Sequence, residues 1–487
     1  MKRNISINPI TRLEGHGKIE IFLNEAGEVE NAYFQVPELR GFEVFCKGRP
    51  VEEMPQITAR LCGVCPAAHH LASAKAADAV YSVDPPTTAK KLRELMYMAH
   101  FCHSHIAHFY VLAAPDFICG PEAPPTERNI LGVIARAGLK VGGQVIEQRS
   151  NAQRAQALLA GRATHMAWAI PGGVSKALSE SDRKTLVEWG EGMREFASFS
   201  LKLFREVVLG NSMYVDMIRS DPYALKVHNM GLVDRNDRVN FYDGTVKVCS
   251  PDGIEIDRYH PADYLNHIAE WVEPYTYLKF PFLKIRGWKG FEEGDSSGVY
   301  SATPLSRLNV ASGMATPSAQ EAYEEFYTTL GAKPVHSVLA NHWARLIELI
   351  YAAERWCELV KDPEITNPNV HTIPEAAPKE GVGCVEAPRG TLTHHYVTDE
   401  KGVLTSVNLI VGTTNNNAPI SMSITKAARG LISKNTEVTE GTLNKIEMAF
   451  RAYDPCMSCA THSLPGQMPL QINLRELDGK VIRTIRR

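Results

Sequence analysis

A C-x-x-C pair followed shortly by a histidine occurs near each end of the chain. The first motif is RLCGVCPAAHH, with Cys62 and Cys65, and the second is DPCMSCATH, with Cys456 and Cys459. Random placement of ten cysteines in 487 residues would give roughly 0.2 C-x-x-C pairs, so two such pairs are not expected by chance. Thiolates are soft ligands that select zinc, iron–sulfur clusters or other soft transition metals. The four thiols therefore predict one metal site that the fold assembles from both ends of the chain.

Other interpretations of these cysteines explain less. Free cysteines are often small core residues, but that interpretation leaves the repeated spacing unexplained. The sequence shows no secretory leader and no long apolar run, so we expect a cytoplasmic protein with reduced thiols rather than disulfides. A structural zinc site usually takes its ligands from a few dozen residues, and a thioredoxin-type dithiol needs only one C-x-x-C. The spacing alone thus favours a catalytic four-thiolate centre and leaves its metal open.

The bulk composition is that of an ordinary soluble globular protein. Apolar residues make up 44% and charged residues 22% of the chain, and the formal net charge is −3. A nucleic-acid-binding domain would normally carry a strong basic excess, so we expect no nucleic-acid partner. The length of 487 residues allows several domains or one large intertwined body.

The patterns of hydrophobicity and turn residues predict a mixture of long helices and short hairpins. Alternation predicts hairpins at 17–23 with 28–36, at 390–397 with 403–411, and at 470–477 with 480–485. Short strands are expected at 245–250 and 254–259, and a loop at 362–382. Helices are expected at about 67–80, 88–113, 142–161, 179–209, 317–330, 338–361, 419–432 and 439–451.

Further motifs make a family resemblance specific. These are ITRLEGHGKI at 10–19, ELRGFEVF at 38–45, EAPRGTLTHHY at 386–396 and RAYDPCMSCATH at 451–462. Together with the cysteines they closely resemble the large subunit of NiFe hydrogenases, from end to end. HFYVLAAPDFI, PLSRLNVA and HWARLIEL look most like the cytosolic methyl-viologen-reducing (deazaflavin-non-reducing) type. The NAD-reducing bidirectional hydrogenases are similar to a lesser degree.

The resemblance implies an architecture and an activity. The fold would be α+β, with a central bundle of long helices and peripheral small β-hairpin units. Residues 1–462 would form a single intertwined body, and residues 463–487 a C-terminal maturation extension that is cleaved off after metal insertion. The chain would be the catalytic subunit that splits dihydrogen reversibly and heterolytically into protons and electrons.

The same resemblance implies the roles of the cysteines. All four would bind nickel, Cys62 and Cys456 terminally, while Cys65 and Cys459 would also bridge to an iron that carries CO and cyanide. Glu14, in TRLEGH, would relay protons beside a nickel-bound cysteine, because general acid–base work needs a carboxyl group within hydrogen-bond reach.

Further roles are implied around this centre. Arg389 would stand over the open side of the metal pair, and its guanidinium could orient substrate and donate to a cyanide. Thr413, with Thr414 as the second choice, would donate its hydroxyl to the other cyanide. His69 would hydrogen-bond a bridging thiolate and tune its basicity. Asp454 would position Arg389 or ordered water.

A second metal is implied at some distance from the cysteines. Glu43 and His462 resemble two ligands of a buried magnesium or iron, with a backbone carbonyl near Val411 as a weaker third. A carboxylate and a carbonyl fit magnesium, whereas an imidazole makes a transition metal equally suitable. This ion would clamp the C-terminus to the body of the protein.

One segment departs from many membrane-bound relatives. The helix HFCHSHIAHFY carries histidines at 100, 103, 105 and 108, and Ser104 stands where those relatives place an aspartate. Ser104 therefore removes one carboxylate near the expected centre. We interpret the four histidines as hydrogen-bonded core or interface residues rather than as a further metal site.

The sequence also indicates how electrons would leave. The six remaining cysteines are dispersed, and no G-x-G-x-x-G precedes an acidic residue at dinucleotide-binding spacing. Electrons must therefore leave through other proteins, and an iron–sulfur small subunit with further electron-transfer subunits is expected. The resemblance also implies a maturation endopeptidase and nickel-insertion chaperones as partners, and no membrane span is expected. The alternatives are a quinone-site subunit of the complex I type, which lacks the cysteine set, and a non-catalytic zinc-thiolate scaffold.

Overall fold

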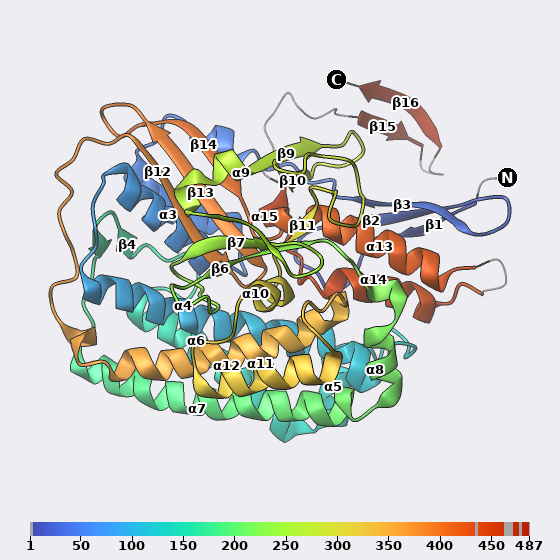
Figure 1. Cartoon of the computed structure of the whole chain (residues 1–487), viewed down its shortest axis with the longest axis horizontal. Coiled ribbons are helices and arrows are strands. Elements are labelled where there is room, and N and C mark those ends of the chain that lie inside the picture. Colours follow the sequence, from blue (N-terminus) through green and yellow to red (C-terminus); the bar gives the residue numbers. More distant parts are fainter. Residues whose placement is uncertain (1–2, 434–436, 462–470, 477–479, 487) are drawn as a thin grey trace.

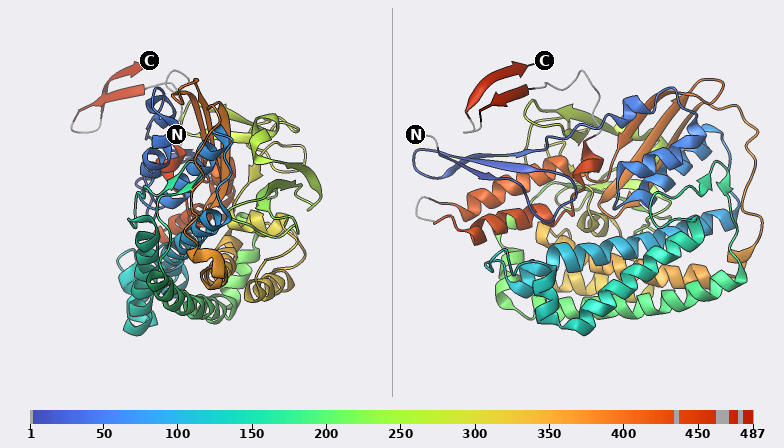
Figure 2. Two further views of the ribbon diagram at one scale, coloured as in Figure 1. Left: turned by 90° about the vertical axis from the view of Figure 1, so that its left-hand side faces the viewer. Right: turned by 180° about the vertical axis from the view of Figure 1, so that it is seen from behind.

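Long helices and small sheets occupy different sides of the molecule. The computed structural model describes residues 3–433, 437–461, 471–476 and 480–486. In Figure 1 the long helices lie together in the lower half and the sheets lie above them, and the view from behind in Figure 2 shows the same division. The arrangement agrees with the predicted α+β fold of long helices flanked by small β units.

Four long helices form the bundle. They are α4 (Thr87–Ala107), α6 (Leu139–Ala160), α7 (Glu180–Phe204) and α12 (Asn341–Lys361). Helix α12 packs against α4 and α7, and α6 also packs against both. Ser179 begins α7 as an N-cap, where its hydroxyl accepts the Asp182 N–H. Nearly every side chain of α12 is buried, which makes it a central helix of the bundle.

Two predicted helices end in wider π turns. The segment predicted at 88–113 is α4 followed by the π segments η3 (His108–Ala113) and η4 (Pro115–Cys119), and α7 continues into η5 (Arg205–Leu209). Pro115 lacks the N–H that an α-helix would donate to the preceding turn, so a regular α-helical ladder cannot run through this position. The π segments bring the end of α4 close to the N-terminal loop, where Arg12 donates to the Leu112 carbonyl at 2.8 Å.

The N-terminal hairpin is part of a three-stranded sheet. Strands β2 (Lys18–Leu23) and β3 (Val29–Gln35) pair antiparallel as predicted, with Ile19 opposite Phe34. Strand β1 (Arg3–Ile7), which the sequence did not reveal, pairs with β2 along its other edge. Helices α13 (Asn417–Leu431) and α14 (Glu440–Arg451) pack together, and α13 contacts β3.

A second sheet carries the predicted short strands. It has the order β11-β6-β7-β8, with β6 (His228–Val233), β7 (Thr245–Cys249), β8 (Glu255–Tyr259) and β11 (Tyr300–Ser301). The pair β7–β8 confirms the predicted strands, whereas β6 and the parallel neighbour β11 were missed. Both missed strands are buried and do not alternate between apolar and polar residues.

A third sheet and helix α3 form the part of the fold that carries the first cysteine motif. The sheet has the order β12-β13-β14, with β12 (Glu380–Ala387), β13 (Gly390–Thr398) and β14 (Leu404–Ile410). The predicted hairpin is β13–β14. The predicted loop at 362–382 was wrong at its end, because β12 begins at Glu380.

Glycine in β12 allows α3 (Pro66–Val80) to lie very close to this sheet. A Cβ atom on Gly383 would stand 2.0 Å from the Ala72 carbonyl oxygen. Helix α3 is itself rich in alanine, so its short side chains also permit a close approach. This contact fixes the helix that begins just after Cys65 against the strand that ends just before Arg389.

The remaining elements connect these parts. The helices are α1 (Phe42–Phe45), α2 (Met54–Thr58), α5 (Ile130–Ala137), α8 (Ser212–Arg219), α9 (Tyr264–His267), α10 (Pro304–Val310), α11 (Pro317–Leu330) and α15 (Met457–Ala460). The strands are β4 (Ala169–Ile170), β5 (Gly173–Val174), β9 (Ile268–Val272), β10 (Lys279–Leu283), β15 (Gln471–Arg475) and β16 (Val481–Arg486). The antiparallel pair β15–β16 is the hairpin predicted at the C-terminal end.

One hydrophobic cluster extends through most of the chain. Its buried members run from Ile7 in β1 to Ala460 in α15. The division of the chain at residue 462 stays a prediction. Among the described residues, no helix is both long and apolar enough to cross a membrane.

Candidate metal centre

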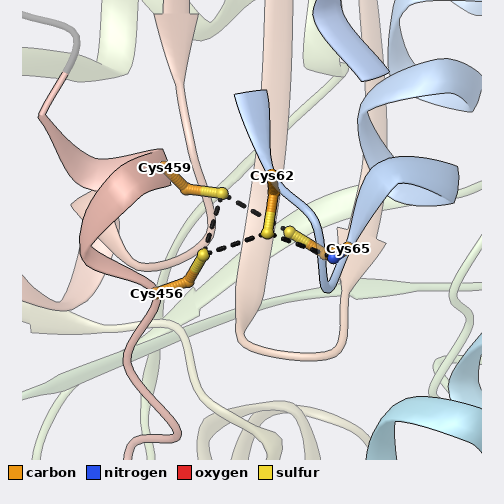
Figure 3. A group of neighbouring side chains, drawn as sticks. All are labelled: Cys62, Cys65, Cys456 and Cys459. Carbon is orange, nitrogen blue, oxygen red and sulfur yellow. Dashed lines mark hydrogen bonds between the residues drawn. The ribbon is translucent and has the colours of Figure 1, made fainter. Parts of the chain in front are cut away.

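The two cysteine motifs meet in the interior. Cys62 and Cys65 lie on the loop that leads into α3, and Cys456 and Cys459 lie at the start and in the middle of α15. Figure 3 shows the four side chains directed toward one another from two separate segments. The Sγ atoms of Cys62 and Cys456 lie 3.2 Å apart, and those of Cys65 and Cys459 lie 3.5 Å apart. All four Sγ atoms lie within 4.8 Å of one another, and all four cysteines are buried free thiols.

The thiols do not share one protonation behaviour. Burial is the main cause that raises the pKa of Cys456 and Cys459 well above the usual range of a thiol. Burial also opposes charge on Cys62, but hydrogen bonds from the other sulfurs hold its pKa well below that range. The Cys62 sulfur additionally accepts the Val64 and Cys65 backbone N–H groups at 3.2 and 3.1 Å. Cys62 is therefore the position where the fold best supports a thiolate.

This donor set fits a soft transition metal. Four convergent sulfurs without a disulfide match the chemistry of zinc, nickel or iron coordination, and a metal would keep the thiols deprotonated. Within the residues that the structure describes, this is the only group of three or more His, Cys, Asp or Glu side chains placed to hold a metal ion. Four sulfurs alone do not choose among these metals.

Glu14 lies directly beside one of the sulfurs. Its Oε2 atom accepts from the Cys456 Sγ at 2.9 Å and from the Ser458 backbone N–H at 3.1 Å. The backbone of Glu14 runs parallel to Cys456, and its carbonyl accepts the Met457 N–H at 2.9 Å. The side chain is half-buried, so it lies between the buried sulfur and the molecular surface. A carboxyl group in this position can exchange a proton with the sulfur side of the centre.

Arg389 lines the cavity beside the cysteines. It occupies a two-residue turn between β12 and β13, and its Nη2 atom donates to Asp454 at 3.0 Å. Its Nη1 atom faces the hydroxyl of Ser104 at 3.4 Å. Despite burial, the positive charge of Arg389 and a hydrogen bond from His108 hold the pKa of the Asp454 carboxyl well below its usual range. The pair therefore carries both charges at neutral pH, and the guanidinium is fixed at the wall of the centre.

A small cavity adjoins the sulfurs and Arg389. Its volume is about 10 Å³, which is the smallest space that would hold a single water. The lining residues include Cys65, Cys459, His69, Arg389 and Thr413. A cavity of this size can admit only a very small molecule without rearrangement.

Thr413 contacts the second cysteine motif through the backbone. Its hydroxyl oxygen accepts the Cys456 N–H at 3.1 Å. Thr414 is buried and lies next to it, at the start of the short helical turn η10 (Thr414–Asn416). The hydroxyl of Thr413 thus lies at the cavity and also fixes the loop that presents Cys456.

His69 begins a hydrogen-bonded chain of side chains. Its Nε2 atom lies 3.4 Å from Cys459 Sγ, and its Nδ1 atom lies 3.1 Å from His394 Nε2. His394 Nδ1 contacts the Tyr396 hydroxyl at 2.7 Å, and this hydroxyl donates to Ser73 at 2.8 Å. Such a chain fixes the ring of His69 against the sulfur. His394 and Tyr396 were missed, although they share one face of β13 in the motif EAPRGTLTHHY.

Arg40 is a second residue that sequence reasoning missed. Its Nη1 atom donates to the carbonyl oxygens of Leu61 at 2.5 Å and Ser458 at 3.4 Å, and its backbone N–H donates to Thr461 at 3.0 Å. One side chain thereby connects the two cysteine segments. Its position in the motif ELRGFEVF was the available signal.

The proposed second metal site is only partly described. Glu43 is buried, and its Oε1 atom accepts from Lys279 Nζ at 3.2 Å and from the Leu409 N–H at 3.3 Å. The Val411 carbonyl accepts from the Asn415 backbone and side chain, both at 3.1 Å. His462 lies outside the described residues. Because Glu43 faces an ammonium group, the described residues do not by themselves form a metal site.

The four histidines of α4 and η3 are buried, as expected of core residues, but the expectation that all are hydrogen-bonded is wrong for His103, whose two ring nitrogens have no hydrogen-bond partner among the described residues. His105 pairs with Glu348 at 2.9 Å, and His108 contacts His342 at 3.0 Å and Asp454 at 3.3 Å. Burial lowers the pKa of His103 to about 3 and of His108 to about 4. They do not form a metal-ligating group among the described residues.

Comparison with known proteins identifies the family. The family model described as nickel-dependent hydrogenase matches residues 40–124 and 296–462, and a HoxL-like model matches residues 4–39. The chain is 46% identical to an iron-sulfur subunit of the F420-non-reducing hydrogenase of Archaeoglobus profundus, over 99% of each chain. It is 40% identical to the corresponding subunit of the F420-non-reducing hydrogenase of Methanothermobacter marburgensis, again over 99% of each.

A second group of hydrogenases is also similar. The chain is 37% identical to the NAD-reducing hydrogenase HoxS subunit beta of Cupriavidus necator, over 99% of each chain. Among solved structures, an NAD+-reducing [NiFe]-hydrogenase in the H2-reduced state superposes with a TM-score of 0.88 at 37% identity, covering 94% of this chain and 99% of that one. The four-cysteine site is accordingly one at which nickel and iron are expected. This chain belongs to the nickel-dependent hydrogenase family, as a large subunit.

Proposed function

We propose that this chain is the catalytic subunit of a NiFe hydrogenase of the F420-non-reducing, methyl-viologen-reducing kind. It would convert dihydrogen into two protons and two electrons, reversibly. The observation that carries the proposal is the cluster of four buried thiols, with the Glu14 carboxyl group hydrogen-bonded to one sulfur and Arg389 lining the small cavity beside three of the cysteines. The higher identity to F420-non-reducing relatives than to the NAD-reducing one supports the choice of subgroup.

The cysteines would hold the metals. When bound, nickel and an iron with CO and cyanide ligands would supply the Lewis-acid and redox chemistry that polarises and splits dihydrogen. Cys62, Cys65, Cys456 and Cys459 would together hold the nickel and the iron.

Glu14 would receive the proton. Its Oε2 atom is 2.9 Å from Cys456 Sγ, within the range for direct proton transfer, and the half-buried side chain can pass the proton outward. Arg389, held by Asp454, would orient the substrate and donate to a metal ligand. Thr413 would donate a second hydrogen bond, and His69 would tune the thiolate of Cys459.

The electrons would leave through other proteins. The relatives are themselves named as subunits of larger hydrogenases, so this chain belongs to a multi-subunit class. We propose an iron–sulfur small subunit with further electron-transfer subunits as partners, and a cytoplasmic location. An endopeptidase and nickel-insertion chaperones would complete maturation by removing residues 463–487, and a second ion, magnesium or iron, would bind Glu43 and His462.

The test is dihydrogen oxidation by the complex purified with its partner subunits. We expect reduction of methyl viologen to exceed reduction of NAD, and we expect Cys62→Ala and Cys456→Ala to abolish dihydrogen uptake. Cys384→Ala is the matched control, because Cys384 is a buried free cysteine outside the four-sulfur group. Full uptake in either ligand variant would contradict the site, and preferred NAD reduction would contradict the subgroup. Intact mass of the active chain tests the proposed cleavage.

A further inference from the structure

A fully buried ionic network lies beside the β12–β13 turn. Arg307, in α10, donates from Nε and Nη2 to the Glu348 carboxylate at 2.6 and 2.8 Å. It also donates from Nη1 to Glu386 at 3.0 Å, and all three side chains are 0% exposed. Taking charged groups out of water is costly, so a buried network of this kind is weak evidence for stability alone. The other contacts of Arg307 indicate its use.

Arg307 also donates to two consecutive backbone carbonyls. Its Nη1 atom lies 3.1 Å from the Ala387 oxygen, and its Nη2 atom lies 3.4 Å from the Pro388 oxygen. Ala387 is the last residue of β12, and Pro388 is the first residue of the two-residue turn, immediately before Arg389. One guanidinium thus fixes both the carboxylates around the turn and the turn itself.

Neighbouring contacts hold the rest of the turn. The Tyr97 hydroxyl donates to the Glu386 carbonyl at 2.5 Å, and Asn416 Nδ2 donates to the Arg389 carbonyl at 2.9 Å. Each carbonyl from Glu386 to Arg389 therefore accepts from a buried side chain. Gly390 has φ +152°, and a Cβ there would lie 2.5 Å from the Gly412 oxygen. The backbone has little room to take another path.

We propose that Arg307 is a positioning residue that holds the β12–β13 turn so that the guanidinium of Arg389 faces the cysteine sulfurs. This inference rests on the function proposed above for Arg389. Arginine suits the task because its planar fork offers five donors, which here reach two carboxylates and two carbonyls. A lysine offers three donors from a single point and cannot span the same acceptors. Arg307 thereby acquires a role within the motif PLSRLNVA.

The test compares Arg307→Lys with a matched control, Arg93→Lys. Arg93 is equally buried, pairs with Asp78 at 2.5 Å, and donates to the carbonyls of Ile170 and Gly173 at 2.8 Å, away from the turn. Misplacement of a reacting group by about 1 Å can cost roughly 100-fold in rate, so we expect Arg307→Lys to lower kcat about 10- to 100-fold. We expect Arg93→Lys to stay within about threefold, because its contacts do not hold a reacting group.

Two further measurements distinguish a positioning role of Arg307 from a general loss of structure in the variant. In the Arg389→Lys background, Arg307→Lys should lower kcat by no more than about threefold, because residues that act through one group are not additive. Hydrogen–deuterium exchange of the peptide covering 386–391 should accelerate in Arg307→Lys and not in Arg93→Lys. Both measurements use the full chain in its complex, at equal nickel and iron content. If Arg307→Lys does not fold, Arg307→Gln with Glu348→Gln removes the two charges together and is measured in the same way.

The outcomes are distinct. Unchanged kcat and unchanged exchange in the Arg307 variant would overturn the inference, and so would a loss that multiplies fully with that of Arg389→Lys. If Arg389→Lys itself kept full turnover, the function proposed for Arg389 would fail. The exchange of peptide 386–391 would in that case still decide whether Arg307 holds the turn.

Discussion

Replacement of Glu14 by glutamine tests the proposed proton path. In the wild type the Ser458 N–H donates to Glu14 Oε2 at 3.1 Å. Glutamine keeps the size of the side chain, and its amide oxygen can still accept this N–H. It cannot take up a proton from the sulfur that lies 2.9 Å away. We therefore expect unchanged metal content and stability but a strong loss of turnover.

The size of this loss follows from the lost acid–base group. Such groups contribute about 10²- to 10⁴-fold to rate. The barrier should therefore rise by about 3–5 kcal/mol, at roughly 1.36 kcal/mol per tenfold change. Aspartate at position 14 withdraws the carboxyl by about 1.5 Å, one C–C bond, beyond hydrogen-bond reach of the sulfur. We expect intermediate activity from that variant, with transfer through water.

The assay is dihydrogen-dependent reduction of methyl viologen, with nickel and iron measured on the same sample. Glu20→Gln is the control, because Glu20 is a buried carboxyl group in β2 that accepts from Asn4 and Ser6. Turnover of Glu14→Gln within about threefold of the wild type, at equal metal content, would refute the assignment of Glu14 as a general acid–base group.

Three further predictions concern packing and charge. Gly383→Ala should destabilise the fold by about 1–3 kcal/mol or more, because its Cβ would meet a carbonyl of α3 at 2.0 Å. The control is Gly143→Ala, in open space on α6, which should be neutral or stabilising. Thermal denaturation measures both variants. Burial lowers the pKa of His70 to about 4, so the free energy of unfolding should fall by up to about 1.4 kcal/mol per pH unit as pH drops from about 6.5 to 4. Denaturation of His70→Gln over the same range should show a smaller change of unfolding free energy with pH. Asp454→Asn should lower the free energy of unfolding by about 3–5 kcal/mol, because it leaves the Arg389 charge buried without its carboxylate. In the wild type the stabilisation by this pair is fully present above about pH 4 and is lost as pH falls. Denaturant titration of both proteins at about pH 7 and pH 3 measures the difference, which should be smaller at pH 3.

Much of the centre could be predicted because its residues occur in short, dense motifs. The cysteine pairs carry their own spacing, and Glu14 and Arg389 lie in segments of distinctive sequence that the structure brings to the same cavity or its sulfurs. Helix-favouring composition and boundary signals such as proline also indicated the long helices of the bundle. These are local signals that need no knowledge of distant contacts.

The strands and residues that were not predicted from the sequence have a common physical cause. Strand β12 has the sequence EGVGCVEA, and glycine disfavours strands on its own. Gly383 is nevertheless required, because Ala72 in α3 approaches the strand so closely. The contact that explains the glycine joins segments that are far apart in the sequence, and no local pattern reveals it.

Supporting residues were missed for the same reason. Arg40 and Arg307 act on backbone carbonyls of other segments, and His394 reaches the centre only through His69. Each is an ordinary polar residue until the chain is folded. Their roles follow from contacts in the folded chain, where Arg40 donates to carbonyls of both cysteine segments and Arg307 donates to carbonyls at the Arg389 turn.

The most direct test of the central claim is the metal content of the purified chain. Because four thiolates can also hold zinc, the sequence motif and the geometry need this measurement to fix the metal. We predict nickel and iron near one each per chain by elemental analysis, lost together in Cys456→Ala. Zinc alone, at about one per chain and without nickel, would contradict the hydrogenase assignment and favour a structural thiolate site.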